Sequence, residues 1–79
     1  MGTELTFKYD KVGDILYIEK CPPYAEQESE ELDYGVVGRF NPLSDEIENL
    51  EILFFSARLA QEGTLRLPVT AEFRRAESA

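Results

Sequence analysis

A polar turn flanked by two runs of strand-forming residues is the feature that most constrains how this chain folds. In the first run Leu5, Phe7 and Tyr9 alternate with polar residues, which is the period-two pattern of a half-buried β-strand. The turn at 10–14 holds a glycine, which tolerates positive φ, and two aspartates, which bond nearby backbone N–H groups. The second run, 15–18, is apolar at every position and predicts a central strand covered on both faces.

Short strands and turns continue beyond this hairpin. Residues 20–27 contain two consecutive prolines, which cannot donate to a sheet ladder, so we expect a mobile loop there. The remaining predicted strands cover 28–32, 36–40 and 50–54, with turns at 33–35 and 41–46.

The hydrophobic period changes at Ser56, which predicts a short helix over 56–62. Ser56 has the right chemistry for an N-cap, and Phe55 and Leu59 can pack across it. Gly63 is well placed to end the helix. A helix of about two turns is not stable alone in water, so we expect it to pack on the sheet.

Apolar residues alternate once more after the helix, which predicts either a last strand or an extended arm. The whole pattern predicts an α+β fold, with an antiparallel sheet of about five to six strands and one short helix. We expect a single domain over 1–73 and a frayed tail over 74–79. The apolar residues of the arm are Leu65, Leu67 and Val69.

The size of the chain favours self-association. A chain of 79 residues buries only about 60% of the surface that its unfolded form exposes, and such domains commonly gain support from disulfides, metal ions or oligomerisation. The single cysteine has no partner and the chain contains no histidine, so we expect a homodimer. One unpaired cysteine is typical of a reducing compartment, and we expect a cytoplasmic protein.

The charge of the chain restricts its partners. Acidic residues outnumber basic ones by 16 to 8, and the net charge is -8. Nucleic acids and anionic membranes both require basic groups on a protein, so neither is an expected partner. A basic protein partner is compatible with the charge, as is a simple role in keeping the domain soluble.

Few residues have the arrangement that catalysis requires. Cys21 lacks an imidazole to lower its pKa. Glu30 and Glu31 are adjacent in a predicted strand and therefore point to opposite faces, so they cannot act together as acid and base. We expect a protein that is not an enzyme and uses no cofactor.

Acidic residues near the second predicted hairpin suggest an alternative role in binding a divalent cation or a small ligand. Glu28 and Glu30 share one face of a strand, and Glu26 lies in the loop before them. Carboxylate oxygens suit Ca²⁺ or Mg²⁺, but the spacing matches no calcium-binding loop. The same charges also discourage edge-to-edge pairing of sheets.

Two tyrosines stand outside the predicted strands. Tyr24 lies in the proline-containing loop and Tyr34 in a turn, where the core does not extend. Because exposed tyrosines often anchor interfaces, we interpret them, together with the apolar residues of the 65–69 arm, as candidate partner-binding residues.

Five segments of the chain match a known pattern in order. They are Tyr9-Asp10-x-x-x-Asp14-x-Leu16-Tyr17-Ile18, Glu28-Ser-Glu-Glu-Leu32, Gly35-Val36-Val37, Leu50-Glu51-Ile52-Leu53 and Ser56-Ala57. Together they resemble the domain-of-unknown-function 2283 family, a widespread prokaryotic group. The turn at 41–46 departs from the family, which tends to have an acidic, glycine-ending turn there. The resemblance implies a compact sheet of β-hairpins followed by a helix, in bacteria or archaea, and it implies no activity.

These observations favour a non-catalytic interaction module. Either a free strand edge or the 65–69 arm would add to a second copy or to a basic protein partner. An antitoxin-like or accessory role would suit the size and charge. The competing hypothesis is the cation-binding or small-ligand-binding protein that uses the acidic segment 26–33.

Overall fold

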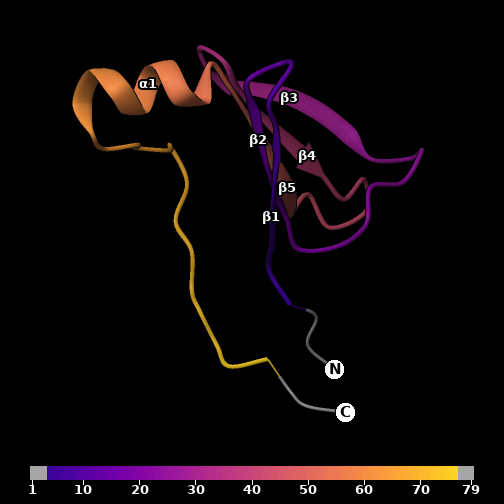
Figure 1. The fold of residues 1–79 in the computed structure, drawn as a ribbon. Helices are drawn as coiled ribbons and strands as arrows, with labels where there is room; N and C mark the ends of the chain where they lie inside the picture. Colours follow the sequence, from indigo (N-terminus) through magenta and orange to yellow (C-terminus); the bar gives the residue numbers. More distant parts are fainter. Residues whose placement is uncertain (1–3, 77–79) are drawn as a thin grey trace.

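Two hairpins and a fifth strand between them build the sheet in the computed structural model, which describes residues 4–76. The strands run antiparallel in the order β1-β2-β5-β4-β3, and the helix α1 follows β5 (Figure 1). The predicted α+β fold is therefore confirmed, with five strands in the described residues. The elements are β1 (Thr6–Asp10), β2 (Ile15–Glu19), β3 (Glu28–Asp33), β4 (Val36–Phe40), β5 (Ile47–Leu53) and α1 (Phe55–Glu62).

The middle of the sheet is β5, which pairs with β2 on one side and β4 on the other. The prediction that the second run forms a central strand covered on both faces is only partly right. β2 is paired along both edges, but Leu16 is its one buried residue. β5 begins at Ile47, three residues before the predicted start, because Ile47 pairs with Phe40 across a bulge in β5, where Glu48 is the extra residue.

One face of the sheet carries the core. Because residues directly opposite each other share a face, the pairs Leu16↔Ile52 and Ile18↔Leu50 place four apolar side chains together. Val36 lies opposite Ile52 on the other side and joins them. The apolar side chains that are buried within residues 4–76 are Leu16, Val36, Leu50 and Ile52. This core is small for a chain of 79 residues.

The start of α1 differs from the prediction. The N-cap is Phe54, in the left-handed conformation at φ 57°, and it provides no side-chain cap. Ser56 lies inside the first turn instead. Gly63 ends the helix as predicted, at φ 70°, and its N–H donates to the Leu59 carbonyl at 2.6 Å. α1 lies beside the end of the sheet with no buried residue (Figure 1).

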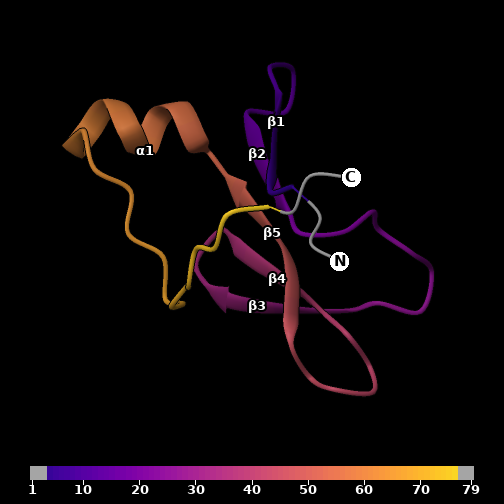
Figure 2. The ribbon, with the colours of Figure 1, turned by 90° about the horizontal axis from the view of Figure 1, so that it is seen from below.

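The chain after α1 returns as an extended arm and forms no strand (Figure 2). Leu65, Leu67 and Val69 are half-buried and pack against the core. Of the two predicted alternatives the extended arm is therefore right. No helix within the described range combines the length and apolar composition needed to cross a membrane.

Candidate functional site

The outer edge of β1 is the most exposed apolar part of the sheet. Within residues 4–76, β1 pairs with β2 alone, so one row of its backbone N–H and C=O groups has no partner strand. Phe7 is 59% exposed and Leu5 39% exposed. Phe7 lies opposite Ile18 and therefore on the same face as the core. An unpaired edge with exposed apolar side chains is a ready template for another strand.

The opposite edge of the sheet has a different character. β3 reads Glu-Ser-Glu-Glu-Leu-Asp, and all its residues except Leu32 are exposed. A bulge interrupts its pairing with β4 between Glu31 and Asp33. Charged side chains and bulges are the devices by which natural sheets prevent pairing at an edge. The two edges are thus not equivalent: β3 carries acidic side chains and a bulge, whereas β1 exposes Phe7 and pairs with β2 without a register shift.

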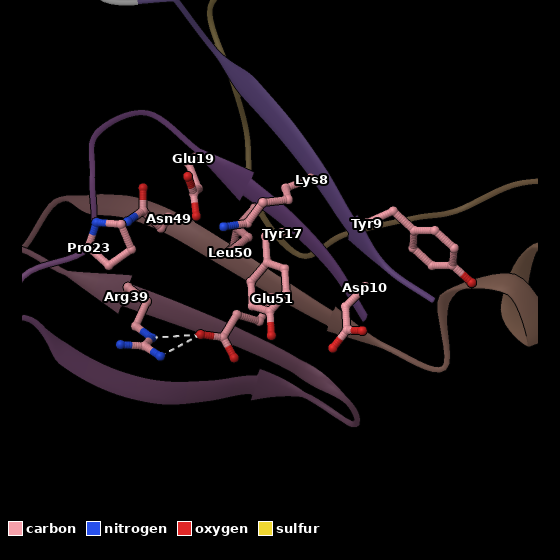
Figure 3. Close-up of a pocket in the computed structure, with 10 residues that line it drawn as sticks. All are labelled: Lys8, Tyr9, Asp10, Tyr17, Glu19, Pro23, Arg39, Asn49, Leu50 and Glu51. Carbon is pink, nitrogen blue, oxygen red and sulfur yellow. Dashed lines mark hydrogen bonds and ion pairs between the residues drawn. The ribbon is translucent and has the colours of Figure 1, made fainter. Parts of the chain in front are cut away.

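The polar face of the sheet, opposite the core, is slightly hollowed. The concavity has a volume of about 480 Å³, and the Arg39 and Glu51 side chains that line it form an ion pair (Figure 3). Arg39 donates from Nε to the Glu51 carboxylate at 2.8 Å, and the Lys8 ammonium lies 5.9 Å from the Tyr17 ring centroid. The lining residues are Lys8, Tyr9, Asp10, Tyr17, Glu19, Pro23, Arg39, Asn49, Leu50 and Glu51.

Three of the residues that line this concavity are engaged within the chain. Arg39 and Glu51 are only 34% and 20% exposed in their side chains and already form an ion pair. Asn49 is buried, and its Oδ1 accepts the N–H groups of Lys20 and Cys21 at 3.0 and 3.4 Å. The two hydrogen bonds of Asn49 hold the start of the 20–27 loop against β5.

The motif residues Tyr9 and Asp14 form a structural contact. The Tyr9 hydroxyl donates to Asp14 Oδ1 at 2.6 Å, and the Tyr9 ring meets Phe55 edge-on at 5.7 Å. This hydrogen bond, together with those from Ser56, lowers the pKa of the Asp14 carboxyl. The same bond to Asp14 raises the pKa of Tyr9. The Asp14 carboxylate thereby joins the first hairpin to the start of α1.

Tyr24, one of the predicted partner-binding residues, is engaged within the chain. Its hydroxyl donates to Glu48 Oε1 at 2.7 Å, and this bond raises the pKa of Tyr24 to about 12. Gln27 and Asn41 also donate to the Glu48 carboxylate, each at 3.0 Å. The three hydrogen bonds, led by that from Tyr24, lower the pKa of Glu48. They anchor the loop that the sequence predicts to be mobile.

The sequence gives little signal for Glu48. Its three hydrogen-bond donors lie 24, 21 and 7 residues away, and nothing in the local pattern distinguishes it from Glu46 beside it. The same holds for the open edge of β1, since the strand order that leaves β1 unpaired depends on contacts between distant segments.

Tyr34 lies where the sequence predicts, in the turn between β3 and β4, and is 75% exposed. Its ring stacks on Phe54 with centroids 6.0 Å apart. The other predicted partner-binding residues, Leu65, Leu67 and Val69, pack against the core of their own chain. The structure therefore does not gather these residues and Tyr24 into one surface.

The predicted acidic and thiol groups are likewise dispersed. Glu26, Glu28 and Glu30 are exposed, and within the described residues no three acidic or cysteine side chains are placed to hold a metal ion. Cys21 is partly buried, and this burial raises the pKa of its thiol. A raised pKa disfavours the thiolate that a nucleophile requires.

The fold defines a class of small α+β domain, a five-stranded antiparallel sheet in which the edge strand β1 exposes apolar side chains. The model of a family of proteins of unknown function, DUF2283, matches residues 6–56. This match covers more than half of the chain, and the chain therefore belongs to the DUF2283 family. It includes all five strands and both Asp14 and Ser56, but not the 65–69 arm. No curated protein and no solved structure matches the chain.

Proposed function

We propose that this protein is a non-catalytic interaction module that self-associates by strand addition at β1. The observation that carries the proposal is the contrast between the two edges. Within the described residues the outer edge of β1 has no partner strand and exposes Phe7, whereas the edge at β3 is acidic and bulged. Strand addition at a sheet edge is a recurrent mode of recognition, in which backbone hydrogen bonds provide much of the affinity.

The arm is a weaker candidate for this role than the β1 edge. Its three apolar side chains already cover the core of their own sheet, so a partner would have to displace them first. Phe7 requires no such displacement because it is already exposed. If the module also binds a different protein, the net charge of -8 favours a basic one.

Light scattering coupled to size-exclusion chromatography tests the proposal. We expect a dimer that dissociates on dilution, and we expect Phe7→Lys to abolish it by placing a charge at the edge. The matched control is Val12→Lys, which changes an apolar residue that is 100% exposed in the turn after β1. A wild-type protein that stays monomeric at every concentration would contradict the proposal, as would equal effects of the two substitutions.

A further inference from the structure

We infer that the strand added at β1 is the β1 strand of a second copy, paired antiparallel about Thr6. The inference rests on the proposed function and specifies the register, that is, which residues of the two β1 strands lie opposite each other. Two copies related by a two-fold axis form an isologous contact, in which one residue of the strand lies opposite its own equivalent. Each choice of that central residue fixes all other pairs, so the side chains of 4–10 decide between the registers.

Registers centred on Leu5 or Tyr9 are too short. Within 4–10, each brings only three residues of one copy opposite three of the other. Tyr9 is also committed elsewhere, since its hydroxyl bonds to Asp14 and its ring contacts Phe55. The remaining centres are Thr6, Phe7 and Lys8.

Two of these three registers place side chains of like charge opposite each other. A register centred on Lys8 places the Lys8 ammonium directly opposite its equivalent. A register centred on Phe7 places Glu4 opposite Asp10 of the other copy, and does so twice because of the symmetry. The Asp10 carboxylate is fixed close to the backbone by the N–H groups of Val12 and Gly13, at 3.1 and 3.3 Å. Like charges directly opposite in a sheet are destabilising.

The register centred on Thr6 pairs opposite charges and apolar groups instead. Glu4 of each copy lies opposite Lys8 of the other. Leu5 of each copy lies opposite Phe7 of the other, on the face that carries Ile18 and the core. In the single chain Leu5 is 39% exposed and Phe7 is 59% exposed. The register brings the two side chains of one copy together with the two of the other. The two five-stranded sheets become one continuous sheet whose core extends across the two-fold axis.

Cysteine substitution tests the register directly. Residues opposite each other in an antiparallel pair have Cα atoms about 4.5 or 5.5 Å apart, and both distances allow a disulfide. In a Cys21→Ser background, we expect Thr6→Cys to form a disulfide-linked dimer readily on mild oxidation. Phe7→Cys and Lys8→Cys, each compared at the same protein concentration, are expected to crosslink at least tenfold more slowly.

A charge exchange provides an independent test in case an added thiol perturbs the edge. Glu4→Lys places a lysine opposite Lys8 of the other copy, twice because of the symmetry, and we expect the dimer Kd to rise about tenfold at low salt. The double variant Glu4→Lys/Lys8→Glu is expected to restore the wild-type Kd to within about threefold. A dimer that crosslinks best through Phe7→Cys or Lys8→Cys, or that the double variant does not restore, overturns the register alone. A Cys21→Ser protein that is a monomer overturns the proposed function with it.

Discussion

Asp14 accepts two hydrogen bonds from Ser56, one from the backbone N–H at 3.0 Å and one from the hydroxyl at 2.9 Å. The backbone carbonyl of Asp14 also accepts the N–H of Phe55 at 3.0 Å. The first N–H groups of a helix have no intrahelical partner, and Phe54 at the N-cap offers no side-chain oxygen. A residue in the turn between β1 and β2 therefore caps α1 from 42 residues away.

Replacing Asp14 is expected to loosen the helix. Asp14→Ala removes the cap and the acceptor of the Tyr9 hydroxyl, and it also places alanine at φ 56°. Asp45→Ala is the matched control, because Asp45 is exposed and has the same left-handed conformation at φ 62°. We expect Asp14→Ala to lower Tm by roughly 5 °C more than Asp45→Ala does, as measured by circular dichroism. Equal losses of Tm would mean that the hydrogen bonds of the Asp14 carboxylate contribute nothing beyond the cost of the left-handed backbone conformation.

The Glu48 network predicts a loss of stability in acid. Its hydrogen bonds lower the pKa of Glu48 in the folded protein, with Tyr24 as the main donor. A carboxyl whose folded pKa lies below its unfolded value of about 4.3 stabilises the fold above that value. The contribution is lost as the pH falls through the folded pKa. Asp14 has a lowered pKa as well and acts in the same direction.

Urea unfolding between pH 7 and pH 2.5 measures this effect. The urea concentration at the unfolding midpoint of the wild type is expected to decrease once the pH is below about 4. Glu48→Gln should make this midpoint depend less on pH, because it removes one of the titrating groups. Glu46→Gln is the control, since it removes an exposed carboxylate next to the network without touching it. An unchanged pH profile in Glu48→Gln would contradict the role assigned to these hydrogen bonds.

Tyr24 is expected to titrate late in alkali. Its hydrogen bond to Glu48 raises its pKa to about 12, above the usual value of about 10. A tyrosine with a raised folded pKa stabilises the fold below its unfolded pKa, and this contribution is lost as the pH rises through 12. Absorbance at 295 nm measures the ionisation, and the difference between wild type and Tyr24→Phe isolates this residue. Glu48→Gln should return the pKa of Tyr24 toward 10, and no change in that variant would contradict the contact.

The strands and the helix could be predicted from the sequence because their signals are local. Alternation at Leu5, Phe7 and Tyr9 depends only on which side of a strand is buried. The turns likewise follow from residues such as Gly35, which takes φ 72° between β3 and β4. These signals predict the ends of each element to within about three residues, and the fold class could therefore be predicted from the sequence.

The candidate site could be predicted less well from the sequence, because its position depends on the strand order. Local periodicity does not show that β5 pairs with β2 as well as β4, yet this pairing leaves β1 at an edge. Nor does it show that Asp14 caps the helix in place of Ser56, since the two lie at opposite ends of the sheet-forming sequence. Tyr24 illustrates the same point, because a loop position predicted to be free for a partner is fixed by a distant carboxylate.

Gly35 connects the second hairpin to α1 and gives the last prediction. The side chain of Arg58 reaches back from α1, where its Nε donates to the Leu53 carbonyl at 2.8 Å and its Nη2 donates to the Tyr34 carbonyl. A Cβ at Gly35 would collide with the Arg58 guanidinium and would also occupy φ 72°. Gly63 takes nearly the same φ of 70°, but a Cβ there meets no atom within 4 Å.

The pair Gly35→Ala and Gly63→Ala separates backbone strain from the steric clash. Gly63→Ala carries the strain alone, about 1 kcal/mol, whereas Gly35→Ala adds displacement of Arg58 and the loss of its two hydrogen bonds. We expect Gly35→Ala to lower the free energy of unfolding by about 2 to 3 kcal/mol, as measured by urea denaturation. Adding Arg58→Ala to Gly35→Ala should recover part of the clash cost, because it removes the side chain that the new methyl group meets. If Gly35→Ala costs no more than Gly63→Ala, the arginine yields freely and does not hold α1 to the turn.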